Sequence, residues 1–122
     1  MDIEESKGEL IKYMIYLIEK KIGNLIEYDQ NMANDAELHA KYMAEQDKLS
    51  KTPEEFLYSN ELIGSMTISS KHIKIGLLNM LDKWFKYEEN RQKVMNAKKM
   101  GMGLSLKENQ GKTKIYATKR LL

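Results

Sequence analysis

The apolar residues at positions 10–26 recur every three or four residues, and this spacing constrains the fold more than any other feature of the chain. It gathers their side chains on one side of an α-helix, and that side must be buried against other elements. In a heptad repeat these residues alternate between positions a and d. The sequence therefore predicts a packing face, or the seam of a homodimer, formed by Ile11, Ile15, Ile18, Ile22 and Leu25.

The heptad pattern weakens at Asp29, and two interpretations of the first 50 residues stay open. Either one helix continues to about Leu49, or it breaks near residues 29–31 and a second helix of about 15 residues follows. Alanines at positions 33, 36, 40 and 44 favour helix after this point in both cases. We prefer the nearly continuous helix.

Two further helices and a hairpin are expected after residue 50. Thr52, Pro53 and two glutamates are typical of a helix start, which predicts a short helix to about Ile63. A second helix is expected from near Ser69 toward Lys99, ended by glycines at positions 101 and 103. Beyond them, two strand-like runs flank a loop that contains Gly111, which predicts a β-hairpin.

Together these patterns predict a mainly α fold in one domain, residues 1–122. Residues 1–50 would form a long amphipathic helix or a helical hairpin, and residues 52–100 a helical region. Residues 101–122 would form a short, basic C-terminal β-hairpin or tail. This order of elements is compatible with a winged-helix-like unit.

Charge is sorted along the chain. Residues 91–122 carry nine of the 20 Lys and Arg residues but only one of the 18 acidic residues, Glu108. The rest of the chain is therefore acidic, and the formal net charge of +2 hides this asymmetry. A basic segment of this kind favours a polyanionic partner. The alternatives are solubilising charge on an exposed tail, or pairing with the acidic part of another copy.

Residues 60–85 resemble a helix–turn–helix in their spacing, with a turn at positions 67–70 and a second helix that begins with hydroxyl and basic residues. A basic hairpin would then serve as a wing. The alternative is an ordinary helical hairpin with a solvated corner. The nucleic-acid contacts expected from this interpretation are Ser69, Ser70, Lys71, Lys74, Arg91, Lys98, Lys99, Lys112, Lys114, Lys119 and Arg120.

Catalytic and metal chemistry find little support. The chain has no cysteine, which excludes disulfides and thiolate nucleophiles, and its two histidines, His39 and His72, lie in no catalytic or metal-binding pattern. We therefore expect no enzyme activity, no catalytic residues, no cofactor and no metal. The acidic N-terminus argues against a secretory signal, and no apolar run is long enough for a membrane span, which predicts a cytoplasmic protein.

The sequence thus predicts a small, non-enzymatic regulator that binds nucleic acid, most simply DNA, through residues 71–120 and forms a homodimer through its first helix. The alternative is an inhibitor or adaptor that binds another protein through its helical surfaces and has no nucleic-acid role.

Overall fold

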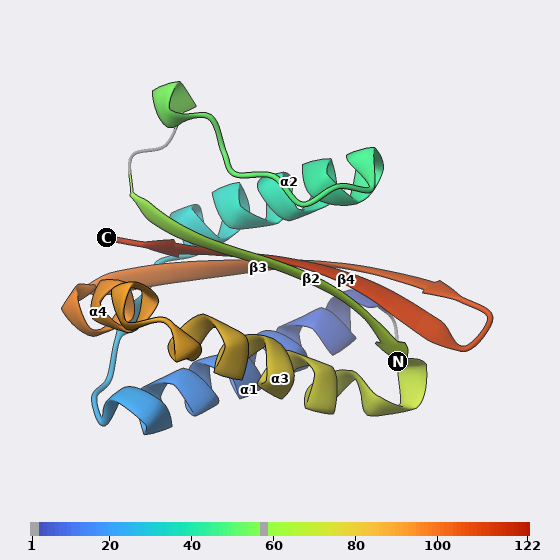
Figure 1. Cartoon of the computed structure of the whole chain (residues 1–122), viewed down its shortest axis with the longest axis horizontal. Coiled ribbons are helices and arrows are strands. Elements are labelled where there is room, and N and C mark those ends of the chain that lie inside the picture. The colour runs from blue at the N-terminus through green and yellow to red at the C-terminus, as the bar shows by residue number, and fades with distance from the viewer. Residues whose placement is uncertain (1–2, 57–58) are drawn as a thin grey trace.

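The computed structural model describes residues 3–56 and 59–122 and shows a four-stranded sheet with helices on both faces (Figure 1). The helices and strands, in chain order, are α1 (Ile3–Ile22), β1 (Glu27–Tyr28), α2 (Gln30–Gln46), the 3-10 helix η1 (Glu54–Phe56), β2 (Asn60–Ser69), the 3-10 helix η2 (Ser70–His72), α3 (Ile73–Lys86), α4 (Glu88–Asn96), β3 (Lys99–Asn109) and β4 (Lys112–Leu121).

The sheet has the strand order β1-β3-β4-β2. Its two central strands form an antiparallel hairpin whose turn, Gln110 and Gly111, has φ angles of 53° and 78°. Positive φ at both residues matches the right-handed twist of the flanking strands. On one side β4 pairs antiparallel with β2, and on the other β3 pairs parallel with the two-residue β1.

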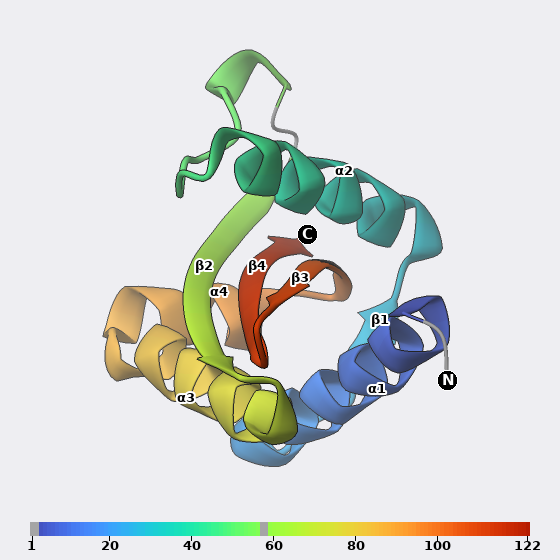
Figure 2. The ribbon, with the colours of Figure 1, turned by 90° about the vertical axis from the view of Figure 1, so that its right-hand side faces the viewer.

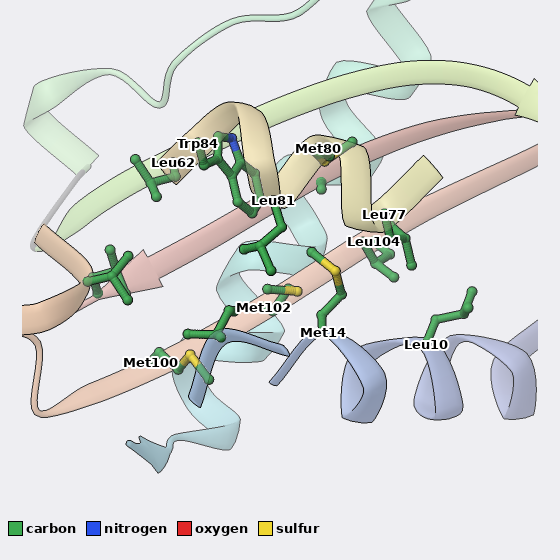
Figure 3. Packing of buried hydrophobic residues seen from close by; sticks show 14 of the residues in the cluster. Leu10, Met14, Leu62, Leu77, Met80, Leu81, Trp84, Met100, Met102 and Leu104 are labelled. Atoms are coloured by element: carbon green, nitrogen blue, oxygen red, sulfur yellow. The ribbon is translucent and has the colours of Figure 1, made fainter. Parts of the chain in front are cut away.

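Two layers of helix cover the sheet, as the end-on view shows (Figure 2). Helices α1 and α3 lie on one face, where Met14, Ile18, Leu77 and Leu81 are fully buried in the main apolar core (Figure 3). Helix α2 lies on the other face. Because both faces are covered, consecutive residues over much of the two central strands are buried, instead of buried residues alternating with exposed ones.

Helix α2 approaches the sheet closely because β3 offers it two glycines. A β-carbon added at Gly101 would lie 2.2 Å from the backbone nitrogen of Ala33, and one added at Gly103 would lie 2.1 Å from that of Glu37. No larger residue fits at either position without moving the helix backbone.

The prediction of a mainly α, winged-helix-like fold is wrong. Residues 60–69 form strand β2, not the end of a helix, and η1 is a single turn after Pro53. The side chains of Leu62, Met66 and Ile68 lie on one face of this strand and join the core under α3. The stability of this strand comes from pairing with β4, a partner about fifty residues away that local helix signals do not reveal.

The preferred continuous N-terminal helix is also wrong. Helix α1 ends at Ile22, before Gly23 with φ 71°, and α2 begins after Asp29, whose carboxylate accepts a hydrogen bond of 3.0 Å from the backbone nitrogen of Met32. The alternative of two helices is therefore correct, but the break spans residues 23–29 and not residues 29–31. Asp29 interrupts the heptad because it caps the second helix.

The predicted hairpin segment does contain a hairpin, but its strands are the centre of the sheet rather than a basic appendage. The apolar face of α1 packs inside the same chain. Ile18 is fully buried, Ile11, Ile15 and Ile22 pack against the core, and Leu25 is 84% exposed.

Candidate binding groove

A buried ion pair joins β2 and β4 on the face of the sheet that α2 covers. Glu61 of β2 and Arg120 of β4 are directly opposite each other, and their side chains are 3% and 4% exposed. Arg120 Nη2 lies 3.3 Å from Glu61 Oε2. Such a pair is stable only when further hydrogen bonds satisfy both groups.

Thr52 supplies those hydrogen bonds. Its backbone nitrogen donates to Glu61 Oε1 at 2.9 Å and its hydroxyl donates to Glu61 Oε2 at 2.6 Å. The same hydroxyl accepts from Arg120 Nη2 at 2.9 Å. The ion pair therefore anchors the segment that follows α2 to the sheet. Arg120 Nε is buried and has no hydrogen-bond partner among the residues that the structure describes.

A groove of about 630 Å³ opens above this ion pair, between α2 and residues 50–53. His39 of α2 is buried and its Nε2 donates to the carbonyl oxygen of Ser50 at 2.7 Å, which ties the segment to the helix. Its ring also stacks on Tyr42, with centroids 6.0 Å apart. The groove is lined by Asp35, Leu38, His39, Tyr42, Ser50, Lys51, Thr52, Pro53 and Arg120. It thus combines the apolar side chains of Leu38 and Pro53 with an exposed cation, Lys51.

We expect Glu61→Gln to lower the free energy of unfolding by about 3 kcal/mol, because it leaves the buried Arg120 guanidinium without a counter-charge. Urea denaturation measures this loss. The double variant Glu61→Leu with Arg120→Met removes both charges and should recover most of the stability. A Glu61→Gln protein as stable as the wild type would contradict the importance of the pair.

A second buried charge lies on the opposite face of the sheet. Lys119 of β4 is fully buried, and its Nζ has no hydrogen-bond partner among the described residues. It lies 4.7 Å from the centre of the Trp84 ring and 5.8 Å from that of Phe85. Burial lowers the pKa of Lys119 from 10.5 to about 7.

The residues predicted to contact nucleic acid do not form one surface. Lys119 and Arg120 are buried. At the hairpin end of the molecule, Ser69 pairs with Lys112, and the Ser70 hydroxyl lies 2.7 Å from that of Thr113. Lys71 and Lys74 follow Ser70 in the chain, and Lys114 lies opposite Thr67 in the β2–β4 register. By contrast, Arg91 is on α4, Lys98 lies just before β3, and Lys99 begins β3 at the other end (Figure 1).

Sequence reasoning missed Glu61, Thr52, Leu38 and Tyr42. A usable signal was present in residues 115–121, where two adjacent cations interrupt an otherwise strand-forming, apolar run. Cations in a central strand need a buried partner or an aromatic neighbour, and here Arg120 has the first and Lys119 the second.

Within residues 3–56 and 59–122, no three His, Cys, Asp or Glu side chains lie close enough together to hold a metal ion. No helix in this part of the chain is long and apolar enough to cross a membrane.

Solved structures with the same arrangement of helices and strands come from several sources. An outer surface protein from Borrelia burgdorferi is 16% identical with a TM-score of 0.56, over 99% of this chain and 95% of that one. Schistosoma mansoni venom allergen-like protein 4 is 13% identical with a TM-score of 0.52, over 96% and 88%. The protein MpPR-1i is 15% identical with a TM-score of 0.55, over 99% and 93%. At these identities the likeness shows the fold alone.

No curated protein sequence matches the chain. The family model described as "CAP: Cysteine-rich secretory protein family" matches residues 20–118. This range includes β1, β2 and β3 completely and most of β4. This match and the shared fold overturn the prediction of a DNA-binding transcription regulator with a helix–turn–helix. A protein partner is compatible with them, whereas a nucleic-acid partner and a homodimer through the first helix receive no support. The chain belongs to the CAP family.

Proposed function

We propose that this chain is a non-enzymatic protein-binding module that holds a segment of a partner protein in the groove between α2 and residues 50–53. One observation carries the proposal. Leu38 and Tyr42, one helical turn apart on the outer side of α2, are 67% and 51% exposed beside the groove. Two large apolar side chains at the edge of a groove favour contact with another molecule.

The chemistry of the groove supports a protein partner. Tyrosine is enriched where proteins bind one another, because it offers a large contact area together with a hydrogen-bond donor. Stacking on His39 holds the Tyr42 ring in place, which reduces the entropy lost on binding. Lys51, an exposed cation that lines the same groove, matches an acidic group. A partner segment with an apolar side chain next to an acidic residue fits these features.

The hydrogen bonds in the groove support binding rather than catalysis. The Thr52 hydroxyl is engaged with Glu61 and Arg120, and His39 Nε2 donates to a backbone carbonyl. Neither arrangement is the nucleophile–base hydrogen bond that covalent catalysis needs.

The cytoplasmic location stays a prediction. Because the chain has no cysteine, its CAP fold does not depend on an oxidising compartment.

A displayed library of random peptides tests the proposal. We expect the immobilised protein to enrich peptides with an apolar residue beside Asp or Glu. Leu38→Glu and Tyr42→Ala should weaken their binding at least tenfold, equivalent to about 1.4 kcal/mol. Leu25→Glu is the matched control, since Leu25 is exposed but remote from the groove.

Two results would refute the proposal. One is a failure to enrich any peptide. The other is a set of enriched peptides that bind the wild type, Leu38→Glu and Tyr42→Ala equally well.

A further inference from the structure

Strand β2 is one edge of the sheet, and no described strand pairs with its outer side (Figure 2). The two-residue turn makes Asn109 and Lys112 a hydrogen-bonded pair, so even-numbered residues of β4 bond to β3 and odd-numbered ones bond to β2. The β2–β4 register places these odd-numbered residues opposite the even-numbered residues of β2. The N–H and C=O groups of Ile63, Ser65 and Thr67 therefore point outward.

One hydrogen bond supports this assignment. Trp84 Nε1 donates to the carbonyl oxygen of Ile63 at 2.9 Å, as expected for a carbonyl that faces away from β4. Among the described residues, no turn, loop, cap or side chain forms a hydrogen bond with the outward backbone groups of Ser65 or Thr67. These groups are therefore available to an added strand.

The edge lacks the features with which proteins prevent strand pairing. Residues 60–69 contain no lysine, arginine or proline, and all ten pair with β4 without a bulge. Short strands, charges, prolines and bulges are the usual protection. An unprotected edge of this length suits an extended peptide, which binds by adding a strand to the sheet.

A groove of about 470 Å³ lies along this edge at residues 63–66. On one side it is lined by Leu49, which follows α2 and is 45% exposed, and on the other by Met80 and Tyr87 at α3, of which Tyr87 is 61% exposed. Because the side chains of a strand point alternately to its two faces, an added strand places successive side chains against the two sides in turn.

The charge of this groove selects an acidic partner. Lys83 of α3 is exposed and is the one charged side chain among the lining residues. It forms no ion pair with any residue that the structure describes. The acidic residues near it in the chain each lie within ion-pair distance of another cation, in the pairs Lys21–Asp82, Arg91–Glu88 and Lys93–Glu89. The side-chain amides of Asn79 and Asn90 add further donors on the same side.

We infer that the β2 edge binds an extended peptide of a partner protein as a fifth strand, with acidic side chains toward Lys83 and apolar side chains toward Leu49. Hydrogen bonds with the backbone of Ser65 and Thr67 hold the peptide, and the alternation of acidic and apolar residues selects it. This surface shares no lining residue with the α2 groove and does not depend on the function proposed for that groove.

Fluorescence anisotropy with a labelled heptapeptide of alternating valine and glutamate tests the inference. We expect a dissociation constant below about 100 µM in about 150 mM salt, which screens weak contacts between exposed charges. Lys83→Glu should raise this constant at least tenfold, and the variant should instead bind a peptide of alternating valine and lysine. Lys86→Glu is the matched control, since it makes the same charge change at an exposed position of α3 outside the groove. Leu38→Glu, in the α2 groove, should also leave the affinity unchanged.

N-methylation of the peptide tests strand pairing without altering the protein. Only alternate N–H groups of an added strand face β2. Methylating either all the valine nitrogens or all the glutamate nitrogens gives two peptides, of which one should bind at least tenfold more weakly and the other should bind like the parent. Two methylated peptides of equal affinity, or a Lys83→Glu protein that binds the parent peptide as tightly as the wild type, would overturn the inference. So would the absence of binding at about 1 mM protein.

Discussion

Gly103→Ala is expected to leave the protein largely unfolded in the absence of stabilising additives. The added methyl group would lie 2.1 Å from the backbone nitrogen of Glu37 and 2.3 Å from its α-carbon. Overpacked side chains usually relax at a cost of about 1–3 kcal/mol, but here the obstacle is helix backbone, which moves only with all of α2. That movement would separate the sheet from the buried residues Met32, Ala36, Ala40 and Met43.

Thermal and urea denaturation, followed by circular dichroism, measure the effect. A loss of more than about 4 kcal/mol is expected, close to the whole stability of many domains. Gly8→Ala is the matched control, because a β-carbon there has no atom within 4 Å and Gly8 lies inside α1. It should stabilise the protein by up to about 1 kcal/mol. A Gly103→Ala protein that unfolds cooperatively at nearly wild-type urea concentration would contradict the close packing described here.

Lys119→Met is expected to stabilise the protein below neutral pH and to remove a pH dependence between about pH 7 and 10.5. The pKa of Lys119 is lowered to about 7 in the folded state from 10.5, so in this window the unfolded chain holds a proton that the folded chain lacks. Wild-type stability must therefore rise with pH across the window, by about 5 kcal/mol in total. Below pH 7 both states are protonated, and the full cost of burying the charge remains.

Urea denaturation of both proteins at several pH values gives the difference curve, in which titrations common to both cancel. At pH 6 the variant should be more stable by several kcal/mol, reduced by the loss of the Trp84 cation–π contact. Lys48→Met, at an exposed position, should show neither effect. Parallel curves for the wild type and Lys119→Met from pH 7 to 10 would show that the amine is not desolvated.

Local patterns predicted the helices better than the sheet. The apolar spacing of α1, the alanines of α2 and the stripe of Ile73, Leu77 and Leu81 each indicate a helix without reference to the rest of the chain. Strand β2 has no comparable local signal, because its hydrogen bonds come from β4. The wrong prediction of a helix at residues 60–63 then led to the wrong prediction of function, because the helix–turn–helix interpretation needed that helix.

The candidate groove was hidden for a related reason. Arg120 and Lys119 were assigned to a solvated basic tail, and only the position of β4 between β3 and β2 shows that both must be buried. The partner of Arg120, Glu61, is about sixty residues away in sequence. Leu38 and Tyr42 looked like ordinary helix residues, and their exposure became visible only when α2 was placed on the sheet.

The central place of β4 also affects how the chain folds as it is synthesised. Strands β2 and β3 do not pair with each other, and each is held mainly by β4, which follows both in chain order. Until β4 has left the ribosome, the apolar sides of α1, α2 and α3 have no completed sheet to cover. The nascent chain therefore exposes these surfaces until β4 has been synthesised, and in that interval it depends on protection from aggregation.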